Sequence, residues 1–165
     1  MLFSEQRKPC EKAIIRLLER VCDPEIPTLS IKDLGVLRDV YVKNDQIEVV
    51  ITPTYSGCPA MTVIEADIVE CLRSNGYGNV VVTTLLAPAW TTDWLSSKGR
   101  ETLKEAGIAP PSACGNTGAT VKKNIECPLC SSKSVALLSE FGTTACKSLY
   151  RCNKCLEPFD YFKCH

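Results

Sequence analysis

The sequence contains a single histidine, His165. This excludes a two-histidine metal site within one chain, and it excludes a Ser-His-Asp apparatus that does not use His165. We also find no glycine-rich phosphate loop, no dinucleotide-binding fingerprint and no Glu-x-x-His pattern of the kind that di-iron carboxylate proteins use. These absences argue against a nucleotide-dependent enzyme and against a chain that carries its own di-iron centre.

The chain also lacks a charge excess, because 19 basic and 19 acidic residues cancel. Composition therefore gives no reason to expect nucleic acid or an anionic membrane as a partner. No apolar run reaches about 20 residues, the length of a membrane span, and charged residues break any signal-peptide core within residues 1–12. We expect a cytoplasmic protein with no membrane partner. Eleven cysteines in that reducing compartment indicate metal binding or thiol chemistry.

Hydrophobic periodicity predicts an α+β fold in which a small α-β-β-α-β-α domain occupies residues 1–107. The expected helices cover residues 11–21, 61–74 and 97–106, and the expected strands cover residues 36–42, 46–52 and 80–86. Residues 108–126 are rich in proline, glycine and small polar residues, so we expect a linker there. Cys114 within it is interpreted as exposed and incidental.

The loop from Thr52 to Met61 carries the first candidate functional residue, Cys58. It lies between an expected strand and an expected helix, where Pro59 suits the first helical position. Unpaired backbone N–H groups and the positive end of the helix dipole would favour the thiolate of Cys58, the form that attacks electrophiles and binds metals. The alternative is that Cys58 is a small buried hydrophobic residue, as free cysteines often are.

Two CxxC pairs mark residues 127–165 as a zinc ribbon: Cys127 with Cys130, and Cys152 with Cys155. Each pair forms a knuckle, and four thiolates complete a tetrahedral structural site for Zn²⁺. A module this small has too little core, so the metal would supply most of its folding energy. An iron–sulfur cluster on the same four ligands is the alternative.

Two cysteines of this module are surplus to a four-thiolate site, Cys146 and Cys164. One hypothesis is that they form a transient metal or cluster site, alone or together with Cys58, and that Lys147 stabilises the thiolate of Cys146. The alternative is packing for Cys146 and an incidental tail thiol for Cys164.

Other residues allow two interpretations each. Asp23 and Glu25 flank Pro24, so they either present carboxylates on a rigid segment or simply form a charged helix end. Cys71 falls on the apolar side of the expected second helix and is assigned no chemistry. Trp90 and Trp94 are either interface anchors, since aromatic residues dominate binding hot spots, or core residues, which is expected of at least one of them.

Several motifs together carry a resemblance to known families. The segment from Asp23 to Pro27, Asp33-Leu34-Gly35 and the loop from Ser56 to Pro59 resemble the small domain shared by SufT and cytosolic iron–sulfur assembly factors. The resemblance to the PaaD family is closer and covers nearly the whole chain. It is carried by four further segments, residues 52–60, 88–94, 139–147 and 156–164.

The resemblance implies an accessory role. PaaD-like proteins are encoded with the subunits of the bacterial phenylacetyl-CoA epoxidase complex and are thought to help mature iron–sulfur or metal centres of that system without bearing its active site. The implied partners are the oxygenase and reductase subunits and other iron–sulfur assembly proteins. In the wider family the cysteine matching Cys58 is an unusually reactive thiol, and the acidic residues matching Asp23 and Glu25 are part of the signature.

Three alternatives compete with a maturation factor that acts through Cys58. The protein could be a structural or adaptor subunit of the epoxidase complex, in which the zinc is only architectural. It could be a thiol enzyme, although no histidine accompanies Cys58. A nucleic-acid-binding ribbon is disfavoured, because residues 121–165 carry too few basic residues for a phosphate-binding stripe.

Overall fold

The computed structural model describes residues 10–111 and 125–163. The first part of the chain builds two helices and two small sheets. Its elements are α1 (Glu11–Leu18), β1 (Cys22–Asp23), β2 (Ile26–Ser30), β3 (Leu37–Lys43), β4 (Gln46–Ile51), α2 (Ala60–Ser74) and β5 (Val80–Thr84). The second part contains η1 (Thr92–Trp94), α3 (Ser97–Glu105), β6 (Ile108–Ala109), β7 (Val135–Ser139), β8 (Lys147–Cys152) and β9 (Pro158–Phe162).

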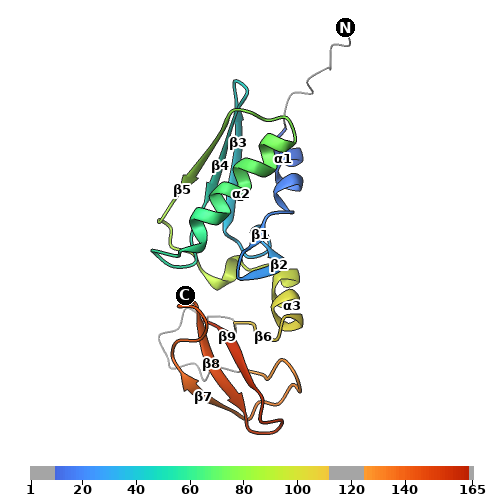
Figure 1. Ribbon diagram of the computed structural model, residues 1–165, viewed down its shortest axis with the longest axis vertical. Helices are drawn as coiled ribbons and strands as arrows, with labels where there is room; N and C mark the ends of the chain where they lie inside the picture. The colour runs from blue at the N-terminus through green and yellow to red at the C-terminus, as the bar shows by residue number, and fades with distance from the viewer. Residues whose placement is uncertain (1–9, 112–124, 164–165) are drawn as a thin grey trace.

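Helices α1 and α2 pack against a three-stranded sheet of order β3-β4-β5 (Figure 1). Strands β3 and β4 form an antiparallel hairpin, and β5 runs parallel to β4 after the α2 crossover. The core between the layers follows from the helical spacing of Ile64, Ile68 and Leu72, which are buried on one side of α2. The predicted α+β class is therefore confirmed, and the end of the sheet where β4 stops and α2 begins carries the loop with Cys58.

One pair of strands was not predicted. The segment from Asp23 to Pro27 is expected to end a helix, whereas β1 and β2 pair antiparallel there, and α1 ends earlier, at Leu18. Pro27 lies inside β2, and this sheet has only two strands. Every strand in such a sheet is an edge, where a missing backbone N–H is tolerated. Elements this short leave no measurable alternation in the sequence.

The motif Asp33-Leu34-Gly35 fastens this hairpin to α3. The Asp33 carboxylate accepts hydrogen bonds from the Ser30 and Ser96 hydroxyls, each at 2.8 Å. Gly35 has φ +80°, and a Cβ there would lie 2.7 Å from the Trp94 carbonyl oxygen. Glycine is needed at this position for both its backbone angle and the close approach. The motif is therefore structural.

The third sheet has the order β6-β9-β8-β7 and forms the ribbon at the other end of the molecule (Figure 1). Strand β6 pairs parallel with β9, with Ile108 opposite Asp160 and Ala109 opposite Tyr161. The stretch predicted as a linker, residues 108–126, thus begins with two residues that belong to the ribbon sheet. Both are buried, which explains why so short a segment pairs. Cys114 lies outside the described residues.

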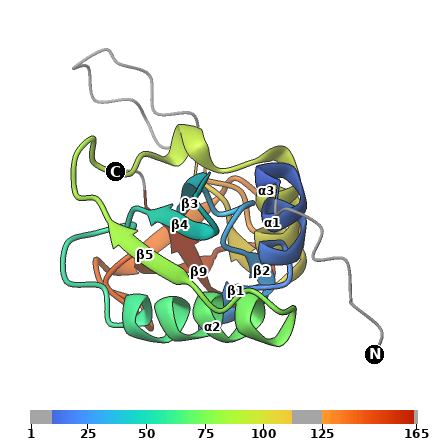
Figure 2. The same cartoon turned by 90° about the horizontal axis from the view of Figure 1, so that it is seen from above.

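The two parts of the chain share a core. The rings of Trp90 and Phe162 have centroids 5.9 Å apart. Phe162 and Cys146, both from the ribbon, are buried in the same cluster as α1, α2 and the three-stranded sheet. Seen from above, the ribbon strands lie behind that sheet (Figure 2). The ribbon is therefore docked on the end of the first domain that carries the Cys58 loop.

Among the residues that the structure describes, no helix combines the length and the apolar character needed to cross a membrane.

Candidate functional site

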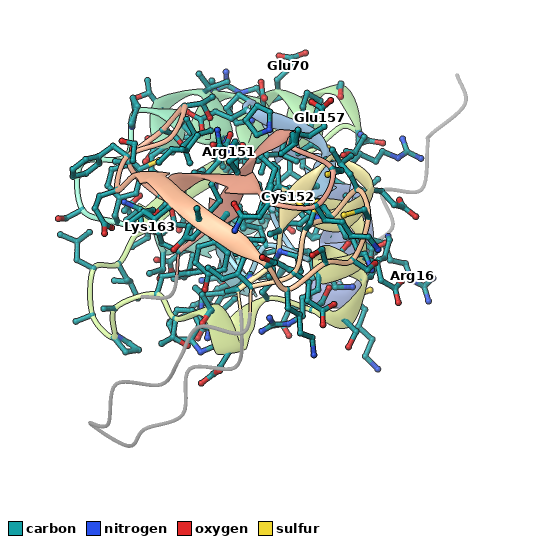
Figure 3. All side chains as sticks on the ribbon, turned by 90° about the horizontal axis from the view of Figure 1, so that it is seen from below. Arg16, Glu70, Arg151, Cys152, Glu157 and Lys163 are labelled. Atoms are coloured by element: carbon teal, nitrogen blue, oxygen red, sulfur yellow. The ribbon has the colours of Figure 1, made fainter. Side chains whose placement is uncertain are left out.

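The four cysteines of the two CxxC pairs converge on one point, which we call the four-cysteine centre. The sulfur atoms of Cys127, Cys130, Cys152 and Cys155 all lie within 4.8 Å of one another. The Sγ atoms of Cys127 and Cys155 are 3.7 Å apart, and those of Cys130 and Cys152 are 3.5 Å apart. Figure 3 looks at the molecule from the ribbon end and labels Cys152 next to Arg151, both of them on β8. Within residues 10–111 and 125–163, these four cysteines are the one group of three or more His, Cys, Asp or Glu side chains whose ligand atoms lie close enough together to hold a metal ion.

The geometry of these sulfurs fits a single tetrahedral ion. Thiolates about 2.3 Å from a zinc ion lie roughly 3.8 Å from one another, which is close to the two separations above. A cluster of several iron atoms places its thiolates on different irons and requires a wider spacing. The backbone N–H groups of Lys154 and Cys155 donate to Cys152 Sγ at 3.3 and 3.4 Å. The bond from Cys155 has the largest influence on the pKa of Cys152, which is lowered to about 6 despite burial, so the sulfur is ready to ligate as thiolate.

The loop between β4 and α2 presents Cys58 beside Tyr55. Pro59 is the N-cap of α2, the Cys58 backbone N–H donates to the Tyr55 carbonyl at 3.3 Å, and Gly57 takes a positive φ of 86°. Cys58 is half-buried against the core. The pKa of Tyr55 is raised to about 12 by burial first, then by the charge of the Cys58 thiolate and a hydrogen bond with it. At neutral pH the phenol therefore keeps its proton and can donate a hydrogen bond to a thiolate.

Asp23 and Glu25 face this loop from the β1–β2 hairpin. Asp23 Oδ1 accepts the backbone N–H groups of Glu25 and Ile26 at 2.8 and 3.0 Å, which closes the hairpin turn. Burial raises the pKa of Asp23, although these two hydrogen bonds and the charge of Lys147 act in the opposite direction. The charge of Glu25 contributes to the raised pKa of Tyr55. Both carboxylates are therefore within electrostatic range of the ribbon or of the Cys58 loop.

The ribbon contributes Cys146 and Lys147 from the turn between β7 and β8. Cys146 is 6% exposed, and its sulfur lies 3.0 Å from the Thr144 hydroxyl. Burial raises the pKa of Cys146, as do the charges of Glu25 and Asp23, while Thr144 and Lys147 lower it. Lys147 Nζ lies 4.0 Å from Glu25 Oε2, an ion pair between the two domains. The charge of Cys146 also raises the pKa of Tyr55.

These contacts assemble a second group of side chains at the junction of the two domains. Five of its members were singled out from the sequence, and the structure brings them together from three separate segments of the chain. The Cys58 loop, the β1–β2 hairpin and the ribbon turn each contribute. We call this group the composite site: Asp23, Glu25, Tyr55, Cys58, Cys146 and Lys147.

Two further residues bear on the composite site. Cys164 lies outside the described residues; it directly follows Lys163, whose backbone N–H donates to the Cys146 carbonyl at 2.9 Å. Tyr55 was not singled out from the sequence. Its position three residues before Cys58 in the same loop is the signal that indicates it.

An apolar groove of about 380 Å³ adjoins the composite site at Tyr55. Pro53, Leu86 and Trp90 line it, and Leu86 on its rim is 63% exposed. Trp90 is a core residue, 3% exposed, whose indole N–H donates to the Leu34 carbonyl. Trp94 is only partly buried and carries the Arg38 guanidinium 3.4 Å above its ring. Of the two tryptophans, Trp90 is therefore the one that the core holds.

Cys71 and Cys22 stand apart from the composite site. Cys71 packs against the core, and its thiol donates to the Leu17 carbonyl at 3.5 Å. Burial raises the pKa values of both thiols. Cys71 thus behaves as the apolar helix residue that the sequence indicates.

Comparison with known proteins divides the chain in the same way. Residues 11–83 match the family described as iron–sulfur cluster assembly protein, and residues 111–163 match the PaaD zinc beta ribbon domain. A domain of unknown function, DUF59, from Bacillus anthracis has a solved structure that matches with a TM-score of 0.53 at 28% sequence identity. That match covers 56% of this chain and 90% of that one.

Two relatives carry functional names. An Fe-S protein maturation auxiliary factor from Porphyromonas gingivalis is 34% identical over 90 residues, which are 53% of this chain and 85% of the relative. An Escherichia coli subunit named "Putative 1,2-phenylacetyl-CoA epoxidase" is 49% identical over 148 residues, 90% of this chain and 89% of the relative. With near-complete coverage of both sequences, and with both domains matched, the chain belongs to the PaaD family.

Proposed function

We propose that this protein is a non-catalytic accessory factor of a phenylacetyl-CoA epoxidase system in aerobic phenylacetate catabolism. Its task would be to assist the maturation of iron–sulfur clusters or metal centres in the oxygenase and reductase subunits. The names of the two relatives, an epoxidase subunit and an Fe-S protein maturation auxiliary factor, support this assignment. Other iron–sulfur assembly proteins are the further partners that this role requires.

The observation that carries the proposal is the composite site, in which two thiols from different domains flank one phenol beside two carboxylates. Thiolates and carboxylates together are ligands for iron. Burial raises the pKa of Cys146, so a metal must displace a proton from that sulfur in order to bind, which weakens binding there. Weak holding suits a site that receives iron or a cluster and passes it on.

Each residue has a distinct part in that role. Cys58 is the accessible thiol that first contacts the cargo, and Cys146 supplies the second sulfur. The pKa of Tyr55 is raised to about 12, so the phenol keeps its proton at neutral pH. It donates a hydrogen bond that steadies the Cys58 thiolate between transfers. Asp23 and Glu25 offer negative charge toward a cation. Cys164, adjacent in sequence to Lys163, is the candidate third sulfur.

We assign the four-cysteine centre a different part, that of a structural zinc site. Its sulfurs fit one tetrahedral ion, and Zn²⁺ bound there would stabilise the ribbon that carries Cys146. Anaerobic purification followed by a metal count and an ultraviolet–visible spectrum tests this assignment. About one zinc per chain without visible absorbance supports it; iron with a visible chromophore would assign the four cysteines to an iron centre instead.

The maturation role is tested with a Cys58→Ser variant, and Cys71→Ser serves as the matched control because Cys71 is a half-buried thiol outside the composite site. Cells producing each variant with the epoxidase subunits are compared for the iron and cluster content of purified oxygenase and reductase. We expect a loss with Cys58→Ser and none with the control. Fully metallated, active epoxidase from the Cys58→Ser cells would refute the proposal.

The groove beside Tyr55 favours a second candidate, an adaptor subunit that binds the epoxidase complex through apolar contacts. Its exposed rim residue Leu86 distinguishes the two roles. Stable co-purification at fixed stoichiometry, abolished by Leu86→Glu and unaffected by Cys58→Ser, would support the adaptor. Transient association that depends on Cys58 would support maturation.

A further inference from the structure

Lys147 is buried to an unusual degree for a lysine. Its side chain is 5% exposed, and among the described residues it is the one charged side chain in the buried class. An ammonium taken out of water is unfavourable unless hydrogen bonds and opposite charge compensate it. The groups around Lys147 therefore decide whether the ribbon turn can hold it there at all.

Two residues of the ribbon supply the compensation through one hydroxyl. Lys147 Nζ donates to Thr143 Oγ1 at 3.1 Å, and Thr143 Oγ1 donates to Asp160 Oδ2 at 3.0 Å. A hydroxyl has one proton, so accepting from Lys147 commits that proton to Asp160. The order Lys147, Thr143, Asp160 is thus a directed chain that begins at the composite site and ends on β9.

The fit around Asp160 is tight enough to fix this chain. Its second oxygen, Oδ1, is buried with no hydrogen-bond partner in the described part of the protein. A Cβ at Gly142 would collide with that oxygen and lie 3.3 Å from Lys147 Cβ. The turn is closed by the Gly142 backbone N–H, which donates to the Lys147 carbonyl at 2.8 Å. Asp160 thus holds its charge against the turn, and Thr143 joins that charge to the Lys147 ammonium.

On its other side the Lys147 ammonium faces the first domain. Glu25 Oε2 lies 4.0 Å away. The charge of Lys147 also partly offsets the rise that burial causes in the pKa values of Asp23 and Cys146. Cys146 immediately precedes Lys147, and the Lys147 backbone N–H donates to the Thr144 carbonyl at 3.1 Å, so holding the lysine also holds the turn that carries that sulfur. A lysine free to turn into solvent would leave two carboxylates of the first domain without its counter-charge.

We propose that Thr143 and Asp160 are positioning residues that aim Lys147 at Glu25 and so hold Cys146 in the composite site. The purpose of this arrangement rests on the proposed function, whereas the arrangement itself rests on the contacts above. Both residues act on the site through the lysine ammonium.

The test measures how well Cys146 is protected from alkylation in the purified full-length protein, by mass spectrometry after timed iodoacetamide treatment. Thr143→Val keeps the shape of the side chain and removes the hydroxyl, and Thr143→Ser keeps the hydroxyl. We expect about a tenfold faster modification of Cys146 in the valine variant, in line with a lost hydrogen bond to a charged group. The serine variant should return to the wild-type rate.

Two further measurements distinguish a positioning role of Thr143 from a general loosening of the turn that carries Cys146. Ser148→Ala removes another hydrogen bond of the same turn, from the Ser148 hydroxyl to the Glu140 carbonyl at 3.2 Å, and should leave Cys146 protected. If Thr143 acts through Lys147 on Glu25, adding Glu25→Gln to Thr143→Val should cause little further change. The inference would be overturned if the effects of Thr143→Val and Glu25→Gln added up, or if Thr143→Ser failed to restore the wild-type rate. It would also be overturned if Ser148→Ala exposed Cys146 as much as Thr143→Val does.

This readout needs no client protein, so it is independent of the maturation assay. Epoxidase that matures without Cys58, together with a Thr143→Val variant that exposes Cys146, would refute the proposed function and leave this inference standing. A wild-type alkylation rate of Cys146 in Thr143→Val would overturn this inference and leave the proposed function untouched.

Discussion

The two groups of cysteines in this protein are built in opposite ways. The four-cysteine centre draws its sulfurs from two knuckles of one small module, and all four lie within 4.8 Å of one another. The composite site draws Cys58 and Cys146 from two domains, and burial and carboxylates raise the pKa of Cys146. The first arrangement is suited to hold a metal permanently. The second keeps the Cys146 thiol protonated more readily and is suited to exchange.

The largest expected effect comes from removing a ligand of the four-cysteine centre, as in Cys152→Ser. Structural zinc binding contributes roughly 10 kcal/mol or more to the folding of small zinc modules, so the ribbon should unfold. Because the ribbon carries Cys146, the composite site should lose it too. Metal content and alkylation of Cys146 in the same sample check both. A variant that lost its metal and still protected Cys146 would show that the two sites are independent.

Trp90→Ala should loosen the contact between the domains and leave the four-cysteine centre intact. Truncating a fully buried tryptophan costs about 3–5 kcal/mol, and Trp90 packs against Phe162 of the ribbon. Urea unfolding gives the loss of stability, and metal content reports on the ribbon. Trp94→Ala is the matched control: its ring is only partly buried against the core and lies under Arg38, a cation–π contact worth about 1 kcal/mol, so the loss should be smaller. Equal losses in the two variants would contradict the assignment of Trp90 to the shared core.

Cys58→Ser should separate stability from function most clearly. Cys58 is half-buried just before α2, and serine keeps the size of its side chain, so the change in unfolding free energy should stay below about 1 kcal/mol. Metal content of the four-cysteine centre should not change. Thermal unfolding and a zinc assay measure both. A large loss of stability would mean that the residue is mainly a packing residue.

Asp23→Asn is expected to have the smallest effect on stability, with a defined sign. The raised pKa of Asp23 means that the folded state binds its proton more tightly than the unfolded chain does. Its contribution to stability is therefore complete below the unfolded value near 3.8 and is lost as pH rises through the folded pKa. At neutral pH the uncharged asparagine should be as stable as wild type or slightly more stable, because its oxygen still accepts the two N–H groups.

The pH dependence provides the check. Unfolding free energies of wild type and Asp23→Asn should diverge as the pH rises above the unfolded value near 3.8, with the variant gaining. Parallel curves would show that the aspartate is not penalised by burial. A gain in stability together with a loss of maturation would indicate that Asp23 is retained for its charge.

The parts of the molecule that could be predicted are those that depend on local pattern. Two CxxC pairs indicated the four-cysteine centre because the ligand spacing is local to each knuckle, and the side of α2 that is buried followed from its helical period. Strands β1 and β6 were missed because two residues show no period, and β2 was missed because Pro24 and Pro27 indicate the end of a helix. The meeting of Cys146 with Tyr55 and Cys58 depends on how two domains dock, and spacing along the chain carries no information about that.

Strand β6 has a consequence for how these two domains can be separated or exchanged. The assembly-protein family matches residues 11–83 and the ribbon family residues 111–163, so neither includes β6 at Ile108–Ala109. Yet β6 hydrogen-bonds in parallel to β9, and Trp90, which packs on Phe162, lies in the same intervening stretch. A chimera that joins a foreign ribbon at residue 111 would keep the old outer strand against a new sheet. A ribbon exchange therefore has to include β6, although Trp90 and Ser96 in the same stretch hydrogen-bond to the first domain.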